Sequence, residues 1–446
     1  MSMPLRLLAC AVLLTSLSWC QLPQAPTNPP PDERYKADIL LVVGHPDDDI
    51  EVAAYLAKQI EQQHKRVAVV YGTRGNSGGN GAGQEQAAAL ADVREMESRK
   101  SLASYGVTNA WFLRGSDTAS QDVLHSLETW HHGAALEEMV RLVRLTRPEV
   151  ILTWMPNFVV GENHGDHQAA GVIATEAFDL AANPVIFPEQ VNPPRNYSTI
   201  NNYGEGLRPW QPKKIYYFSD SLRFDFYKGN GPEYPTSDVS PAKGVPYSKI
   251  AADAWRYYKT QADFTEQQLK EFTEMPVRLI FGKSLVGGSP TSDVFEGITA
   301  APINYVRPRG YQPEARQGVS LELGGPWAFY HRFRTAHNVE HIESLFPAEA
   351  GIAPGDKLLL PLLIHNDTDS PKQVTLRATL PAGWKQEPGD QVYPVRAHDT
   401  YPVQLAINPP DGQKGWQNLT WTAESDGQKA GSVALRVNAG SNVMPQ

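Results

Sequence analysis

The sequence predicts an α/β domain, built on a mostly parallel sheet sandwiched by helices, followed by a smaller β-sandwich. Two patterns support this division. From residue 36 onward, apolar runs of strand length alternate with segments whose apolar residues recur at helical spacing. After about residue 335, short segments of alternating polarity are separated by turn-forming residues. The chain has 446 residues, 41% of them hydrophobic, which suffices for two or three domains that each bury a core.

The first half of the α/β domain is predicted to run strand, helix, strand, helix. Residues 39–43 are five consecutive apolar residues, which indicates a strand buried on both faces. Residues 50–60 and 87–104 carry apolar residues at helical spacing, and the apolar run 67–71 lies between them. Strands that alternate with helices pair in parallel, so we expect a Rossmann-like sheet. No G-x-G-x-x-G follows the first strand, and no dinucleotide cofactor is predicted.

The following segments continue this alternation. We expect a strand, a helix, a strand and a helix at residues 111–113, 136–145, 150–154 and 168–181. Six glycines between residues 72 and 83 follow the second strand and form either a flexible lid or a loop beside a substrate. Residues 183–210 are rich in Pro and Asn and lack periodicity, which indicates an insertion packed over the pocket. The α/β domain is placed at residues 36–335.

The remaining chain, residues 336–440, is predicted to be the β-sandwich. Five short segments carry the strand pattern, at residues 358–364, 374–380, 401–407, 419–423 and 433–437. Residues 353–356 and 380–384 resemble parts of the immunoglobulin-like modules appended to secreted sugar-processing enzymes. The tryptophans of this region could form a carbohydrate platform, but burial in the sandwich core is the commoner outcome; they are Trp384, Trp416 and Trp421.

The chain begins with the pattern of an export signal. Residues 1–20 hold a basic residue and then an apolar run too short to span a bilayer as a permanent helix. Residues 21–35 are a Pro-rich linker. We therefore expect an exported protein, in a bacterial periplasm or outside the cell. Lipid anchoring at Cys20 is the weaker alternative, because Trp19 stands where a lipobox has a small residue.

Composition excludes some partners. The formal net charge is -9 and neither Lys nor Arg forms a dense run, which argues against nucleic acid and anionic membranes as partners. No integral membrane span is expected. Both cysteines lie within the predicted signal, so the mature chain would hold no disulfide. Nothing in the sequence indicates the oligomeric state.

Two motifs each look like half of a mononuclear metal site. Residues 44–49, Gly-His-Pro-Asp-Asp-Asp, follow the first strand, and the second motif is His-Gly-Asp-His at 164–167. Ligands bind at the carboxyl ends of strands in open α/β sheets. Catalytic zinc takes three nitrogen or oxygen ligands and leaves one position for water. His45 and Asp48 can face a metal, Asp47 can accept a proton, and the second motif supplies another imidazole.

These motifs resemble the signatures of the PIG-L/LmbE-like family of zinc-dependent N-acetylglucosamine deacetylases, His-Pro-Asp-Asp-Glu and His-x-Asp-His. The resemblance covers roughly residues 35–300. Residues 73–76 are similar to the family's Thr-x-Gly-Glu loop, and Arg94 and Glu97 fit its Arg-x-x-Glu helix. Residues 258–261 are similar to its late His-x-Ser-Gln element.

Three positions depart from the family pattern. Asp49 stands where the family usually has Glu, Asn76 replaces the acidic residue of the loop, and Tyr258 replaces the late His. Neither Asp49 nor Asn76 is a predicted metal ligand, so we expect the chemistry to be kept while substrate contacts differ.

Carried over residue by residue, the resemblance assigns a role to each group of the two motifs. It implies one zinc ion per chain with three ligands: His45, Asp48 and His167. It makes Asp47 the general base that acts on the metal-activated water. It makes a protonated His164 the group that stabilises the oxyanion, and Asp166 the carboxylate that orients a neighbouring imidazole.

The resemblance implies a zinc-dependent hydrolase that removes the N-acetyl group from an N-acetylglucosamine-type glycan or glycoconjugate. The exact sugar and acyl group are left open. Two alternatives stand beside this hypothesis. One is a catalytically inactive exported carbohydrate-binding protein. The other, weaker alternative is a non-haem Fe(II) enzyme, because His45, Asp47 and a distant His also fit a 2-His-1-carboxylate triad. Such oxygenases usually have an all-β scaffold, which the strand–helix alternation disfavours.

Overall fold

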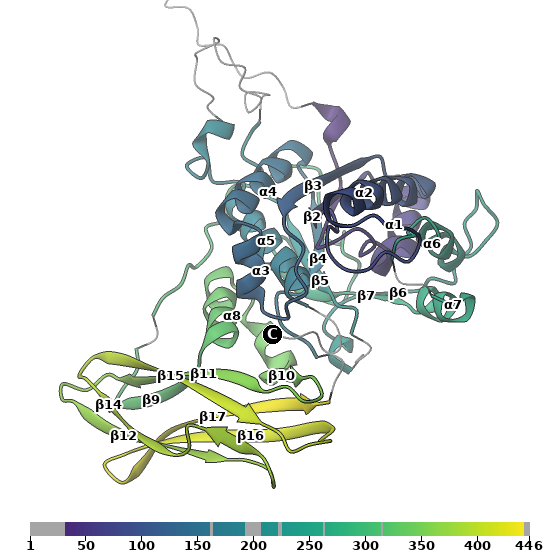
Figure 1. The fold of residues 1–446 in the computed structure, drawn as a ribbon. Coiled ribbons are helices and arrows are strands. Elements are labelled where there is room, and N and C mark those ends of the chain that lie inside the picture. Colours follow the sequence, from purple (N-terminus) through teal and green to yellow (C-terminus); the bar gives the residue numbers. More distant parts are fainter. Residues whose placement is uncertain are drawn as a thin grey trace, which may run out of the picture.

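The computed structural model describes residues 32–160, 164–191, 207–221, 225–261, 264–313 and 315–440. The predicted signal peptide, both cysteines and most of the predicted linker lie outside the described residues. The middle of the predicted insertion at 183–210 also lies outside them. The described chain forms an α/β domain and a β-sandwich, with helix α8 between them (Figure 1).

The α/β domain is built on a six-stranded sheet with the order β3-β2-β1-β4-β5-β8. Neighbouring strands from β3 to β5 are parallel, and β8 pairs antiparallel with β5. Every residue of β1, β2, β4 and β5 is buried, because helices cover both faces of the sheet. The strands are β1 (Ile39–Val43), β2 (Val67–Thr73), β3 (Asn109–Gly115), β4 (Val150–Trp154), β5 (Lys214–Phe218) and β8 (Ile280–Ser284).

Two groups of helices enclose this sheet (Figure 1). One group is α1 (Ile50–Gln63), α2 (Ala87–Ser104), α6 (Tyr247–Trp255) and α7 (Glu266–Glu274). The other is α3 (Val123–Thr129), α4 (His132–Thr146) and α5 (Gly165–Leu180). The short elements are β6 (Glu233–Tyr234), β7 (Val277–Arg278) and the 3-10 helices η1 (Glu33–Tyr35), η2 (Pro188–Gln190) and η4 (Asp225–Tyr227). Each predicted strand and helix of this domain overlaps an observed one, so the predicted mostly parallel α/β sheet is confirmed.

The C-terminal part consists of two sheets, with the orders β10-β17-β16-β12-β14 and β13-β15-β11-β9. The five predicted segments lie in the strands β11 (Leu358–Asn366), β12 (Lys372–Thr379), β15 (Asp399–Asn408), β16 (Gly415–Ser425) and β17 (Gln428–Ala439). The others are β9 (Val319–Leu323), β10 (Glu349–Ile352), β13 (Lys385–Glu387) and β14 (Gln391–Val395). Trp384 and Trp421 are buried in the core between the sheets. Trp416 stacks under Arg436, whose guanidinium carbon is 4.1 Å from the ring centroid. Burial of Trp384 and Trp421 therefore excludes a three-tryptophan platform.

The chain crosses between the two parts more than once. Strand β9 precedes residue 336, the predicted start of the sandwich, yet it pairs antiparallel with β11. Helix α8 (Gly325–His337) and the 3-10 helix η5 (Glu340–Leu345) then return to the α/β domain, whose core includes Phe333 and Ile342. A single cut at residue 336 does not separate the two parts, because it leaves β9 without its partner strand and removes η5 from the first core.

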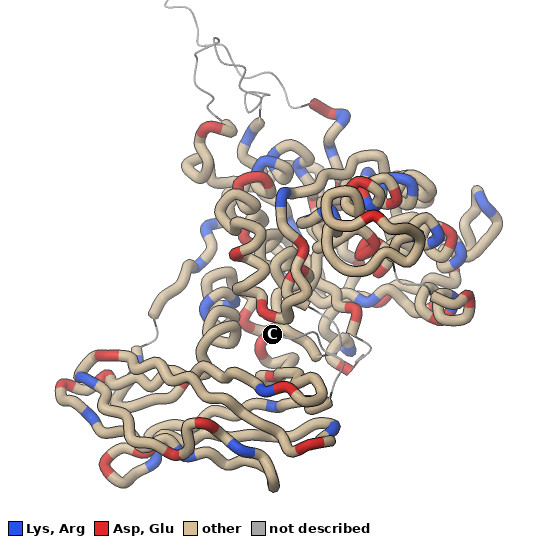
Figure 2. Tube along the Cα trace, in the orientation of Figure 1, with Lys and Arg blue, Asp and Glu red and all other residues tan. Residues whose placement is uncertain are grey.

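Acidic and basic residues are interspersed over both parts, as Figure 2 shows. This distribution agrees with the absence of a dense Lys or Arg run in the sequence. Among the described residues, no helix is both long and apolar enough to cross a membrane.

Candidate metal centre

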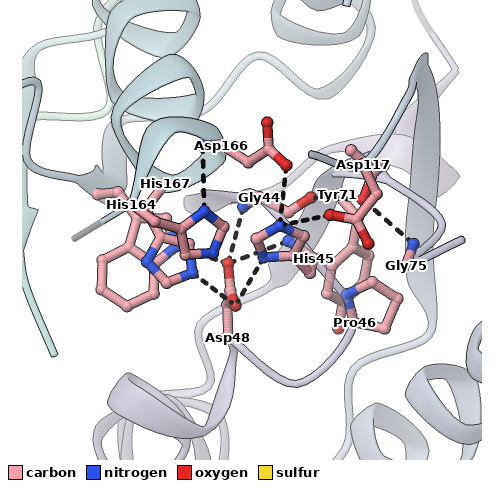
Figure 3. Close-up of polar contacts among 12 residues, drawn as sticks. Gly44, His45, Pro46, Asp48, Tyr71, Gly75, Asp117, His164, Asp166 and His167 are labelled. Carbon is pink, nitrogen blue, oxygen red and sulfur yellow. Dashed lines mark hydrogen bonds and ion pairs between the residues drawn. The ribbon is translucent and has the colours of Figure 1, made fainter. Parts of the chain in front are cut away.

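The two predicted motifs meet at the carboxyl edge of the sheet. The first occupies the turn between β1 and α1, and the second forms the start of α5. Strands β1 and β4 are neighbours, and the strand order reverses between them, which is where doubly wound sheets bind ligands. The structure brings together His45, Asp48, His164, Asp166 and His167 (Figure 3).

Asp48 is held so that one carboxylate oxygen remains for a ligand. Its Oδ2 accepts hydrogen bonds from Gly44 N (2.8 Å), His45 N (3.0 Å) and Trp154 Nε1 (2.6 Å). Its Oδ1 lies 3.5 Å from His45 Nδ1 and 3.3 Å from His167 Nε2. Two ligands bound tetrahedrally at zinc distances would lie about 3.3–3.4 Å apart. Both distances from Asp48 Oδ1 are close to this value, so this oxygen could share a metal ion with either imidazole.

Carboxylates lie on the far side of the His45 and His167 imidazoles. His45 Nε2 lies 3.0 Å from Asp117 Oδ1 and 3.3 Å from Asp166 Oδ2. His167 Nδ1 lies 3.6 Å from Asp220 Oδ2. Metal-bound histidines commonly donate their second N–H to such a group. Asp166, predicted as an orienting carboxylate, thus contacts His45, whereas Asp117 and Asp220 were not predicted.

Trp154, the last residue of β4, contacts His167 on the face of its ring. Its ring stacks on the His167 imidazole, with the centroids 3.9 Å apart and the planes 6° from parallel. The same indole donates its N–H to Asp48. One side chain therefore contacts two of the three predicted ligands.

The charges at the site favour a cation. Burial lowers the pKa of His45, but the carboxylates of Asp117 and Asp48 outweigh it and hold that pKa well above its usual value. Burial raises the pKa of Asp48, but His167 and His45 outweigh it and hold the pKa well below its usual value. The pKa of Asp166 is raised, chiefly by burial. A positive charge among these carboxylates is thus stabilised whether a proton or a metal ion supplies it.

Asp47 differs from the other carboxylates of the motif. It is half-buried and has a φ of 108°, a backbone conformation that is costly for a residue other than glycine. Burial and the neighbouring Asp48 raise the pKa of Asp47 well above its usual value, against the opposing effects of His45 and Arg94. A carboxylate with a raised pKa is a better proton acceptor near neutral pH. The general-base role of Asp47 stays a prediction.

His164 is placed as predicted, but its electrostatics differ from the prediction. It is the N-cap of α5, and its Nδ1 accepts a hydrogen bond from Asp166 N at 3.4 Å. Burial and the neighbouring His167 and His45 lower the pKa of His164 well below its usual value. A neutral imidazole whose Nδ1 is an acceptor carries its proton on Nε2. His164 can therefore donate a hydrogen bond as a neutral group, without the protonation expected from the resemblance.

The geometry also admits other ligand groupings. His45, His164 and His167 each offer a ring nitrogen, and these nitrogens lie within 4.8 Å of one another. His45, Asp117 and Asp166 form a second such group. The grouping with Asp48 differs from these two. Asp48 Oδ2 is fixed by three N–H donors, and Asp48 Oδ1 faces the imidazoles of His45 and His167.

Hydrogen bonds hold the glycine-rich loop between β2 and α2 beside the site. Arg94 donates to the carbonyl oxygens of Gly75, Ser77 and Gly79, each at 2.9 Å. Glu97 accepts from the backbone N–H of Thr260 at 3.1 Å and from its hydroxyl at 2.7 Å. The Arg-x-x-Glu helix thus fixes both the loop and the late element, which favours a fixed loop over a flexible lid.

Contacts from the late element and the loop also reach the site itself. Gln261 Nε2 donates to Pro46 O at 2.8 Å, within the first motif. Asn76 Oδ1 accepts from Asp117 N at 3.0 Å, and Ser77 N donates to Asp117 Oδ2 at 3.0 Å. The residue that replaces the family's acidic group therefore holds the loop that carries Asp117.

Asp49 anchors the start of α1 through three phenols. It is fully buried and accepts hydrogen bonds from Tyr71 (2.8 Å), Tyr105 (3.0 Å) and Tyr258. Burial raises the pKa of Asp49 to about 6, although the three phenols oppose this shift. Two of the departures from the family pattern, Asp49 and Tyr258, are thus in direct contact with each other.

These features define an α/β protein with a histidine–aspartate cluster, a candidate metal centre, at the switch point of its sheet. Residues 40–178, which include both motifs, match the family model described as "PIG-L: GlcNAc-PI de-N-acetylase". This matched segment is the part of the chain that resembles the family.

Two curated relatives are named for the same activity. A 1D-myo-inositol 2-acetamido-2-deoxy-alpha-D-glucopyranoside deacetylase from Streptomyces scabiei is 27% identical over 58% of this chain and 89% of the relative. A similarly named deacetylase 1 from Catenulispora acidiphila is 28% identical over 36% of this chain. The match with the Catenulispora protein spans 54%, about half, of that relative's length.

Two solved structures match part of this chain with low TM-scores. N,N'-diacetylchitobiose deacetylase from Pyrococcus horikoshii has a TM-score of 0.39 and 17% identity, over 55% of this chain and 83% of that chain. The conserved protein TT1542 from Thermus thermophilus has a TM-score of 0.37 and 16% identity, over 58% of this chain and 100% of that chain.

Proposed function

We propose that this protein is a metal-dependent amide hydrolase that removes the N-acetyl group from a 2-acetamido-2-deoxyglucose unit. The observation that carries the proposal is the convergence of His45 Nδ1, Asp48 Oδ1 and His167 Nε2 beside Asp47. The family description and the names of the curated relatives support the deacetylation of such a sugar.

We assign the metal to His45, Asp48 and His167, and we propose zinc, one ion per chain. Zinc prefers this mixture of imidazole and carboxylate ligands, and three protein ligands leave a position open for catalysis. When bound, zinc supplies a Lewis acid that polarises the acetamide carbonyl and lowers the pKa of water. Asp117 and Asp166 position His45, and Asp220 and Trp154 position His167.

Asp47 moves the proton in this scheme. As the oxygen of water bonds to the acetyl carbon, Asp47 accepts one proton from that water. The carbon–nitrogen bond then breaks, and the proton is passed to the departing nitrogen. The reaction consumes one amide bond and one water, and its products are acetate and a free amino sugar.

His164 stabilises the negative charge that develops on the acetyl oxygen. Its neutral ring donates from Nε2 while Nδ1 is occupied by the backbone of Asp166. A donor fixed in place before the reaction contributes more than one that must reorient. The position of His164 at the N-cap of α5 fixes its ring relative to His45 and His167.

The test combines metal analysis with an acetate-release assay. Purified protein should bind about one zinc ion per chain and release acetate from N-acetylglucosamine and chitooligosaccharides. Removal of the metal with a chelator should abolish release, and added zinc should restore it. Protein that binds zinc fully but releases no acetate from any N-acetylated sugar would contradict the proposed reaction. Export and cleavage near residue 20 stay predictions, which N-terminal sequencing of the mature protein tests.

A further inference from the structure

A large cavity lies where the α/β domain meets the β-sandwich. Its volume is about 1350 Å³. The α/β domain contributes the loop after β3 and Phe158 after β4, α8 contributes Trp327, and the sandwich contributes Leu359 of β11 and Gln404 of β15. Figure 1 shows α8 between the two parts that enclose this space.

The cavity lies at the same edge of the sheet as the metal centre. The loops that follow β3 and β4 line it, and both leave the carboxyl ends of their strands. Thr118 is part of the cavity wall, and its backbone N–H donates to Asp166 Oδ2 at 2.8 Å. Asp166 in turn contacts His45 at 3.3 Å. Two contacts therefore link the wall of the cavity to a predicted metal ligand.

The lining combines apolar surfaces with uncharged polar groups. Phe158 and Trp327 are partly exposed, and Leu359 is 51% exposed although it is a large apolar residue. Gln404 and Ser120 supply amide and hydroxyl groups in the same lining. Sugars present apolar ring faces and polar edges, so aromatic faces with nearby hydrogen-bonding groups suit them.

Some charged side chains of the wall are paired with each other. Arg316 donates to Glu322 at 2.7 Å, and Arg334 Nη2 lies 3.7 Å from Glu343 Oε1. The wall also contains Asp122, Glu349, Asp356 and Lys357. Carboxylates outnumber the Arg and Lys side chains in this lining, which disfavours a phosphorylated or polyanionic occupant.

We propose that this cavity binds further neutral sugar units of an oligosaccharide whose acetamido sugar is presented to the metal centre. The volume exceeds the roughly 300–1,000 Å³ of ordinary small-molecule sites, as several linked sugars require. The proposal rests on the proposed deacetylation and makes a short glycan, rather than a single sugar conjugate, the substrate class. It also gives the β-sandwich a role, because β11 and β15 complete the wall.

The first test measures binding apart from catalysis. N-acetylated chitotetraose is titrated calorimetrically into the Asp47→Asn protein and into the same protein carrying Trp327→Ala or Leu359→Glu. Each added substitution should weaken binding roughly tenfold, in line with the loss of one aromatic or apolar contact face. Val392→Glu is the matched control, because Val392 is 56% exposed in the sandwich and lies outside the cavity lining. Since Leu359 is exposed, its replacement should leave folding intact even if Trp327→Ala does not fold.

The second test measures acetate release with substrates of one to five sugars. The kcat/KM of the wild-type protein should rise with substrate length. Leu359→Glu should lower the ratio of kcat/KM for the tetrasaccharide to kcat/KM for the monosaccharide. Val392→Glu should leave this ratio unchanged. No detectable chitotetraose binding, or equal binding by all variants, would overturn the cavity proposal. Activity that does not depend on length would also overturn it while leaving the deacetylase proposal intact. Binding without any acetate release would refute the proposed reaction alone.

Discussion

The tyrosine cluster around Asp49 predicts a stability effect that depends on pH. Tyr258→Phe removes one of three phenols that donate to a fully buried carboxylate. A hydrogen bond to a charged group contributes about 1.5–3 kcal/mol, so this is the expected loss in free energy of unfolding when Asp49 is ionised. The pKa of Asp49 in the folded protein is raised to about 6, so the loss should be close to full at pH 8.

The sign of the pH effect follows from this raised pKa. The stability associated with protonated Asp49 is fully present below its ordinary pKa of 3.8 and is lost as the pH rises through about 6. Tyr258→Phe removes an interaction that lowers this pKa, so the pKa of Asp49 should rise further. At pH 5 Asp49 is mostly protonated in both folded proteins, and the difference between them should be clearly smaller than at pH 8.

The assay is urea unfolding of both proteins at pH 5 and pH 8, with the difference in free energy of unfolding compared between the two. Tyr247→Phe is the matched control, because this phenol donates to Glu61 at 3.0 Å. The pKa of Glu61 is lowered, chiefly by Ser240, so this carboxylate stays ionised at both pH values. The cost of Tyr247→Phe should therefore be nearly independent of pH. An equally pH-independent cost for Tyr258→Phe would refute the assigned electrostatics of Asp49.

Two further substitutions test the arrangement around the predicted ligands. Asp117→Asn removes the carboxylate 3.0 Å from His45 Nε2 and should weaken zinc affinity about 10–100-fold, as titration against a competing chelator would measure; unchanged affinity would show that Asp117 does not position His45. His164→Ala should keep the metal and lower kcat about 10²–10³-fold. Loss of zinc from the His164→Ala protein would instead make His164 a ligand, as the grouping of the three imidazoles permits.

Local patterns in the sequence were sufficient to predict most strands and helices of the α/β domain. The predicted strand at 39–43 and helix at 87–104 have the same bounds as β1 and α2. Both are long or uniformly apolar, so their type follows from the sequence alone. The two motifs could be placed at the same sheet edge because each adjoins a strand or helix that parallel pairing brings together.

Residues that support the site were harder to find. Asp117 and Asp220 belong to no motif, and their single signal is a position just after β3 and β5. Strand β5 was itself not predicted, because it follows the aperiodic segment 183–210 and contains the charged residue Lys214. The neutral state of His164 could not be foreseen either, since it depends on burial and on neighbours from another element.

The junction between the two parts was the least predictable region. Strand β9 has the alternation of a strand, but its partner β11 follows only after α8 and η5. Local patterns do not reveal such pairing between distant segments. The cavity that we propose to bind sugar units arises from the same crossing, and no single motif predicts it.

The central claim is that Asp48 holds the metal while the adjacent Asp47 moves the proton. The measurement is the zinc content and acetate-release rate of Asp47→Asn and Asp48→Asn under one buffer condition. Asp47→Asn should retain about one zinc per chain and lose on the order of 10²–10⁴ in rate, because general-base assistance is removed. Asp48→Asn should lose zinc, because a neutral amide binds it more weakly than a carboxylate. Retained zinc and full activity in both variants, or loss of zinc from Asp47→Asn alone, would contradict this assignment.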